Sequence, residues 1–147
     1  MPLDSGTSTA DRVAMNPTEP LEILYKASGV ARVEQLKKGL PATIFPALAT
    51  RLYLSTKDLA LSLGLSARTL RNRGRKLNVE EAERSFRAFR VLRRATEVLG
   101  DEQTAREWLK TQQRALGERR PLDLLALDVG LEEVLNVLGA IEEGSYL

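Results

Sequence analysis

A short stretch of cationic and amide side chains has the chemistry needed to read DNA. Arg68, Arg71 and Asn72 lie at helical spacing after Ser66, a residue type that favours the start of a helix. Arginine can donate two hydrogen bonds to guanine, and asparagine can bond to adenine in the same way. The side of this predicted helix that faces away from its apolar residues carries Ala67, Arg68, Arg71, Asn72 and Arg75. We therefore expect this side to contact the edges of DNA bases.

Neighbouring polar and cationic residues suit contacts with the phosphate backbone. Ser66 and Thr69 carry hydroxyl groups that can reach a phosphate or a base, and the N-terminus of a helix favours a phosphate. Lysine and arginine neutralise phosphates in such interfaces, and the candidates for that role are Lys57, Arg73 and Lys76.

The charge of the chain is unevenly distributed. Residues 55–76 hold six basic and one acidic side chain, whereas residues 77–147 hold ten basic and fourteen acidic ones. This pattern indicates one polyanion-binding element attached to an acidic body that has another task. The alternative is a solvated basic helix in an ordinary bundle, because basic residues also suit the C-terminal end of a helix. The concentration of charge on one helix favours DNA binding.

Two short helices joined by a tight turn must hold these side chains. A helix-turn-helix needs a small residue where the helices approach, glycine in the turn, and apolar residues that lock the pair. Counting from Thr56, these residues are Ala60, Gly64 and Leu70, with Leu59, Leu63 and Leu65 as the lock. Ser55 and Asp58 fit a capping box at the start of the first helix. Because one such motif covers few base pairs, a dimer or larger assembly is expected.

Helical periodicity in the rest of the chain predicts an all-α fold. Residues 1–20 are expected to form a flexible arm, and helices are predicted near residues 21–25, 30–40 and 44–52. Val30 and Val33 are part of the apolar spacing of the second. Shorter helices are predicted after Asp101, from Pro121 and after Gly130.

The longest predicted helix runs from Asn78 to Gly100, with Asn78 and Glu81 as its N-terminal cap. Its apolar face is Ala82, Phe86, Phe89, Leu92, Ala95 and Leu99. A basic stripe on the same helix consists of Arg84, Arg87, Arg90 and Arg94. Such a stripe is usually a solvated face, and the alternatives are contacts that flank DNA or meet an acidic partner.

The chain contains neither cysteine nor histidine. Disulfides, thiolate metal sites and a cysteine nucleophile are therefore excluded, and the commonest general base and zinc ligand are missing. We expect no enzyme activity, no metal site and no cofactor. No apolar run approaches the roughly 20 residues of a membrane helix, and the first residues do not resemble a secretory signal. The expected compartment is the cytoplasm.

A series of landmarks in the C-terminal half points to a known family. In order they are Glu83-Arg84-Ser85, Gly100, Ala105, Trp108-Leu109, Leu116-Gly117, Pro121-Leu122, Leu125, Gly130, Val134, Leu138, Ile141 and Gly144. This ordered set resembles the toxin-binding domain of the Xre/MbcA/ParS antitoxins, and residues 36–75 resemble the Xre-like helix-turn-helix of the same family. The resemblance implies a RES-domain toxin as partner, one that consumes NAD or transfers its ADP-ribose. It also implies that the C-terminal helix and tail cover the NAD cleft of that toxin, and that the complex represses its own operon.

The C-terminal residues offer a physical reason for this implied role. A cleft that holds the pyrophosphate of NAD must be electropositive, and the chain ends in acidic residues followed by an aromatic one. The residues expected to bind the toxin are Glu142, Glu143, Gly144, Ser145, Tyr146 and Leu147, the last through its carboxylate. The alternative is a frayed acidic terminus with no function.

These observations predict an arm at residues 1–20, an Xre-like helix-turn-helix domain at 21–77 and a toxin-binding domain at 78–147. The predicted function is that of an antitoxin that binds double-stranded operator DNA and acts as an autorepressor. The main alternative is a stand-alone repressor whose C-terminal half only dimerises. A helical enzyme is a third possibility with little support, since histidine, cysteine and a phosphate-binding loop are all absent.

Overall fold

The computed structural model of the chain describes residues 16–71 and 74–144. Within these ranges the chain forms helices and turns and no strand, which confirms the predicted all-α class. The α-helices are α2 (Glu19–Lys26), α3 (Gly29–Lys38), α4 (Ile44–Arg51), α5 (Thr56–Ser62), α6 (Ala67–Arg71), α7 (Val79–Leu99), α8 (Glu102–Leu109) and α9 (Asp128–Glu142). Two short 3-10 helices, η2 (Arg114–Leu116) and η3 (Pro121–Leu124), connect α8 to α9.

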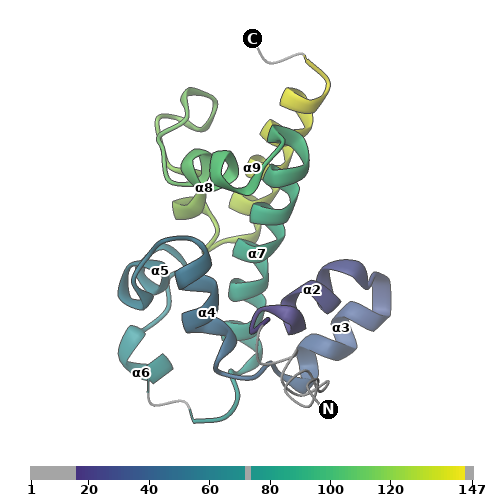
Figure 1. Cartoon of the computed structure of the whole chain (residues 1–147), viewed down its shortest axis with the longest axis vertical. Coiled ribbons are helices and arrows are strands. Elements are labelled where there is room, and N and C mark those ends of the chain that lie inside the picture. Colours follow the sequence, from purple (N-terminus) through teal and green to yellow (C-terminus); the bar gives the residue numbers. More distant parts are fainter. Residues whose placement is uncertain (1–15, 72–73, 145–147) are drawn as a thin grey trace, which may run out of the picture.

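Helix α7 forms the axis of the molecule (Figure 1). The predicted capping box is present, because Asn78 Oδ1 accepts from Glu81 N and Glu81 Oε1 accepts from Asn78 N, both at 2.8 Å. Of the predicted apolar face, Leu99 is half-buried, and the fully buried residues are Ala82, Phe86, Phe89, Leu92 and Ala95. Helices α2, α3 and α4 pack against α7, as do α8 and α9.

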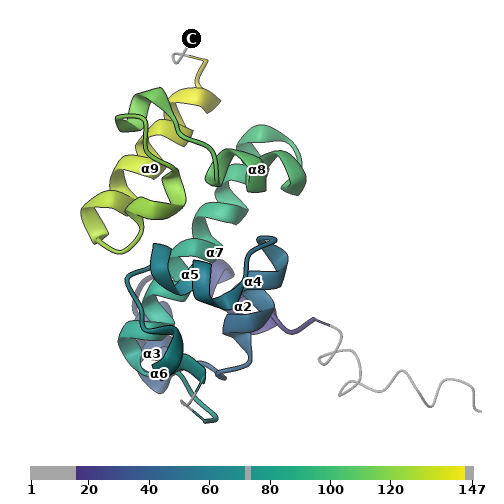
Figure 2. The same ribbon diagram turned by 90° about the vertical axis from the view of Figure 1, so that its left-hand side faces the viewer.

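The two ends of the long axis carry different elements. Helix α6 lies toward one end, and the C-terminal end of α9 lies at the other (Figure 1). The view turned by 90° shows α8 and α9 on either side of α7 (Figure 2). One continuous cluster of buried side chains runs through both parts, from Leu21 in α2 to Leu138 in α9.

Several helix boundaries differ from the predicted ones. Helix α2 begins at Glu19, two residues before the predicted start. The segment from Pro121 forms a 3-10 helix, and α9 begins at Asp128, so that Gly130 lies inside the helix. The predicted apolar spacing from Val30 to Leu40 marks a buried face only in its second half. Val30 and Val33 are 74% and 48% exposed, whereas Leu36 packs against the core and Leu40 is buried.

Every helix within the described ranges is too short or too polar to cross a bilayer. In the same ranges, no three acidic side chains are grouped so that they could hold a metal ion.

Candidate functional site

A helix cap at Ser55 and the close packing around Gly64 fix the turn between α5 and α6. Ser55 Oγ accepts a hydrogen bond from Asp58 N at 3.0 Å and starts α5. The return bond of a full capping box is not made by the shorter aspartate, so this prediction is only half correct. Gly64 has φ +68°, and a Cβ there would lie 3.1 Å from Arg84 Nη1 and 3.3 Å from Ala126 Cβ. The left-handed backbone conformation therefore favours glycine in the turn, and a Cβ there would be tightly placed.

Helix α6 follows at once and presents cationic side chains to solvent. Ser66 Oγ accepts from Thr69 N at 3.2 Å, as its predicted capping role requires. Arg68, Thr69 and Arg71 are exposed, whereas Ala67 is half-buried and packs against the core. The outward face of α6 is thus carried by its arginines.

The other predicted DNA contacts within the described ranges, namely the phosphate candidates Lys57 and Lys76 and the base-side residue Arg75, are also accessible. Lys57 lies in α5, and Arg75 and Lys76 follow α6. Asn72 and Arg73, two further predicted DNA contacts, lie outside the described residues. The structure therefore leaves the cations of this end of the molecule available to a polyanion.

Two arginines of the predicted solvated stripe have a structural role instead. Arg84 Nη1 donates to the carbonyl oxygens of Leu63 and Gly64 at 3.1 and 2.9 Å, which ties the helix-turn-helix turn to α7. Arg87 Nη1 donates to the carbonyl oxygens of Leu125 and Ala126, both at 3.1 Å. The expectation of a solvated face is wrong for these two, because each satisfies the carbonyls that end a neighbouring helical turn.

The acidic end of α9 is only partly free to meet a partner. Glu142 makes a two-point ion pair with Arg94, with Arg94 Nη1 donating at 3.1 Å to Oε2. The hydrogen bonds from Arg94 hold the pKa of Glu142 below its ordinary value. Glu143 and Gly144 are exposed. Ser145, Tyr146 and Leu147 lie outside the described residues.

An open hollow of about 490 Å³ lies between η2, η3 and the start of α9. Leu127 and Val129 line it and remain 65% and 63% exposed, and Glu133 and Arg119 stand at its sides. The sequence gives no sign of this hollow, because it forms where segments after Arg114 fold back on α9.

Both parts of the chain match known domains. Residues 31–93 match the antitoxin Xre-like helix-turn-helix domain, and residues 94–144 match the antitoxin Xre/MbcA/ParS C-terminal toxin-binding domain. An antitoxin Xre of Photorhabdus laumondii is 31% identical over 113 residues, which cover 74% of this chain and 76% of the relative. The chain belongs to the Xre/MbcA/ParS antitoxins.

Two further relatives cover most of the chain. An antitoxin Xre of Yersinia enterocolitica is 27% identical over 127 residues, covering 84% of this chain and 86% of the relative. A protein of a Sphingobium species, named Prs ADP-ribosylating antitoxin, is 27% identical over 142 residues, covering 88% of this chain and 89% of the relative. The exposed arginines of α6 therefore belong to the helix-turn-helix domain of an antitoxin, and α9 belongs to its toxin-binding domain.

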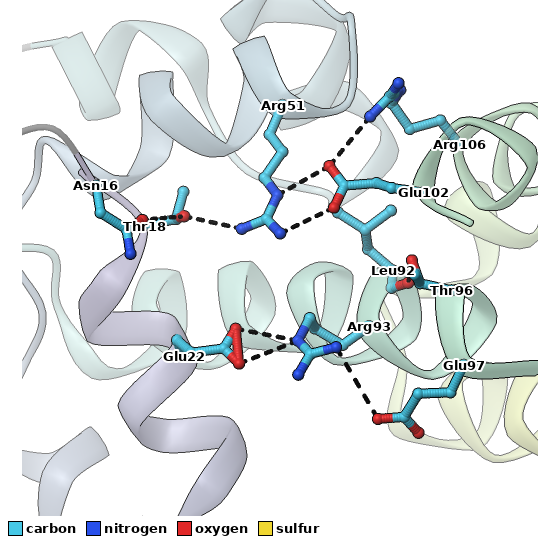
Figure 3. A network of polar contacts seen from close by, with 10 residues as sticks. All are labelled: Asn16, Thr18, Glu22, Arg51, Leu92, Arg93, Thr96, Glu97, Glu102 and Arg106. Carbon is cyan, nitrogen blue, oxygen red and sulfur yellow. Dashed lines mark hydrogen bonds and ion pairs between the residues drawn. The ribbon is translucent and has the colours of Figure 1, made fainter. Parts of the chain in front are cut away.

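A polar network joins the two antitoxin domains (Figure 3). Arg51 of α4 donates from Nε and Nη2 to both carboxylate oxygens of Glu102 in α8, at 2.9 and 2.8 Å. Arg106 Nη1 donates to the same carboxylate at 3.0 Å. Beside it, Arg93 Nε donates to both oxygens of Glu22 at 3.0 and 3.1 Å. The sequence reasoning missed this network, whose central partners are 51 residues apart.

The network makes the stability of the antitoxin depend on pH through Glu102. The hydrogen bond from Arg51 lowers the pKa of Glu102 despite its partial burial. The stabilisation is complete at neutral pH and is lost as the pH falls through that lowered pKa. We expect Glu102→Gln to lower the free energy of unfolding by about 1 kcal/mol at neutral pH, and by much less at an acidic pH below the lowered pKa of Glu102. Urea unfolding at both pH values measures the two differences.

The matched control is Glu107→Gln, which removes an exposed carboxylate from the same helix and should leave the free energy of unfolding nearly unchanged. An equal loss in the free energy of unfolding for Glu102→Gln at both pH values would show that the charge of this side chain does not contribute to stability.

Proposed function

We propose that this chain is the antitoxin of a type II toxin–antitoxin system and neutralises a RES-domain toxin that consumes NAD or transfers its ADP-ribose. The match of residues 94–144 to a toxin-binding domain carries this proposal. The name of the Sphingobium relative includes ADP-ribosylation, which supports an NAD-dependent toxin. The place of action is the cytoplasm, where operator DNA is available.

In the proposed mechanism the C-terminal residues cover the active site of the toxin. The pyrophosphate of NAD requires cations in that cleft, and carboxylates are their natural competitors. Arg94 already pairs with Glu142, which anchors the last turn of α9, and Glu143 is a second exposed acid next to the tail. The tail residues Ser145, Tyr146 and Leu147 then enter the cleft, with the Leu147 carboxylate and the Tyr146 ring as its contacts.

The other end of the molecule binds the operator. The exposed arginines of α6 support direct contact with base edges in the major groove, as expected for the second helix of this motif. Binding of this kind represses the operon that encodes the pair. Because one α6 covers few base pairs, the antitoxin acts as a dimer or as a larger complex with its toxin.

Deletion of residues 144–147 tests the proposed cover of the active site. We expect this truncation to weaken inhibition of the neighbouring toxin by about tenfold or more, because it removes a charge-assisted contact. The readout is NAD loss in cells or with purified toxin. Operator binding is the internal control and should be unchanged, since α6 lies at the opposite end of the molecule.

Full inhibition by the truncated chain would contradict a role for the tail in covering the cleft. The alternative function, a stand-alone repressor, makes a different prediction: the intact chain would bind DNA but would fail to rescue cells that express the neighbouring gene.

A further inference from the structure

A second hollow lies on the side of the molecule where α2 and α3 meet α7 and α9. Its volume is about 410 Å³. Three of its lining residues are arginines, namely Arg32 of α3 and Arg90 and Arg94 of α7, and the others are Tyr25 and Leu135. Three guanidinium groups around one hollow repel each other unless negative charge is supplied.

Arg32 is held in place by neutral partners. Its Nε donates to Leu24 O at 3.1 Å, and its Nη2 donates to Tyr25 O at 3.1 Å and to Ala27 O at 2.8 Å. The guanidinium also lies 5.0 Å from the centroid of the Phe86 ring. Carbonyl groups and a ring orient the side chain, but they do not neutralise its charge.

The other two arginines differ in whether a carboxylate neutralises their charge. Arg94 is paired with Glu142 and lies 3.6 Å from Glu97. Arg90 has no hydrogen bond or ion pair within residues 16–71 and 74–144. Burial lowers the pKa of Arg32, and the positive charge of Arg90 lowers it further. Two cations, at Arg32 and Arg90, therefore face the hollow without a carboxylate of their own.

We propose that this hollow binds a phosphate-bearing anion, whose oxygens accept hydrogen bonds from Arg32 and Arg90. Arginine provides the forked N–H geometry that phosphate oxygens accept. Tyr25 and Leu135 supply a wall for any group attached to the phosphate. Arg32 and Arg90 lie in the helix-turn-helix match, whereas Leu135 lies in the toxin-binding match, so the bound anion bridges the two domains.

The test is a calorimetric titration of the full chain with pyrophosphate and, separately, with ADP at constant ionic strength. We expect saturable binding of one anion per chain. Arg90→Gln should weaken binding by about tenfold, the usual loss for one charge-assisted hydrogen bond. Arg90→Lys should keep part of the affinity, because it retains the charge without the fork. Arg114→Gln is the matched control, since it removes an exposed arginine outside the hollow and should bind as the wild type does.

Arg90 makes no hydrogen bond or ion pair within the part of the chain that the structure describes, so Arg90→Gln should fold normally, which circular dichroism verifies. Tighter binding of ADP than of pyrophosphate would support a ligand that uses the wall formed by Tyr25 and Leu135. Equal binding of the two would support recognition of the phosphate groups alone. The proposal is overturned if neither anion binds at about 1 mM, or if Arg90→Gln and Arg114→Gln weaken binding equally.

Discussion

Replacing Gly130 with alanine is expected to lower the free energy of unfolding by about 3 kcal/mol. Gly130 lies in the first turn of α9, where this helix contacts η3. A Cβ at this position would overlap the carbonyl oxygen of Leu124 and lie 2.8 Å from its carbonyl carbon. Because the obstacle is backbone, α9 or η3 must shift to admit the methyl group. Urea denaturation of the purified chain measures the loss.

The same helix provides a matched control. Gly139 has no heavy atom within 4 Å of the position where a Cβ would be built. Alanine is a better helix former than glycine, so Gly139→Ala should raise the free energy of unfolding by about 0.5–1 kcal/mol. If the two alanine variants changed stability alike, the close approach of α9 to η3 would be refuted.

Replacing Arg71 with alanine is expected to weaken operator binding by about 1–3 kcal/mol and to relax the preference for one base pair. Arg71 is exposed at the end of α6, whereas Ala67 and Leu70 of the same helix are the residues that pack against the core. The fold should therefore be unaffected. Electrophoretic mobility shifts with the operator and with single-base variants measure both effects.

The variant Lys57→Ala distinguishes sequence-specific base contacts from sequence-independent contacts with phosphate. Lys57 is exposed on α5, where a phosphate contact is predicted. Its loss should weaken binding to all sequences alike and reduce the slope of log affinity against log salt by about 1. Unchanged operator affinity in Arg71→Ala would show that α6 is not the base-reading helix.

Local signals in the sequence were sufficient to predict much of the fold. Helix caps were predictable because capping depends on residues three positions apart. The side chains of Ser66 and Asp101 each accept a hydrogen bond from the backbone N–H three residues later, and Asn78 and Glu81 bond to each other. The apolar spacing of α7 also predicted its buried face, because the period of the helix can be read from residues close together in the sequence. The spacing failed at Val30, which stays 74% exposed at the start of α3 although Leu36 of the same helix packs against the core.

Tertiary partners could not be predicted in this way. Arg84 was expected to be solvated, but it donates to Leu63 O and Gly64 O, two carbonyls that only the folded chain brings near. Nothing in the local sequence marks Arg51 as the partner of Glu102, since many other ion pairs were equally compatible with the charges. The cationic face of α6 could be predicted because its residues are consecutive in one short helix.

We propose that operator binding and toxin neutralisation are functions of opposite ends of one chain. The most direct test measures both activities of Arg71→Ala in parallel, by operator shift and by rescue of cells that express the neighbouring toxin. We expect weaker operator binding with full rescue. A folded Arg71→Ala variant that loses rescue in step with its affinity for DNA would contradict it.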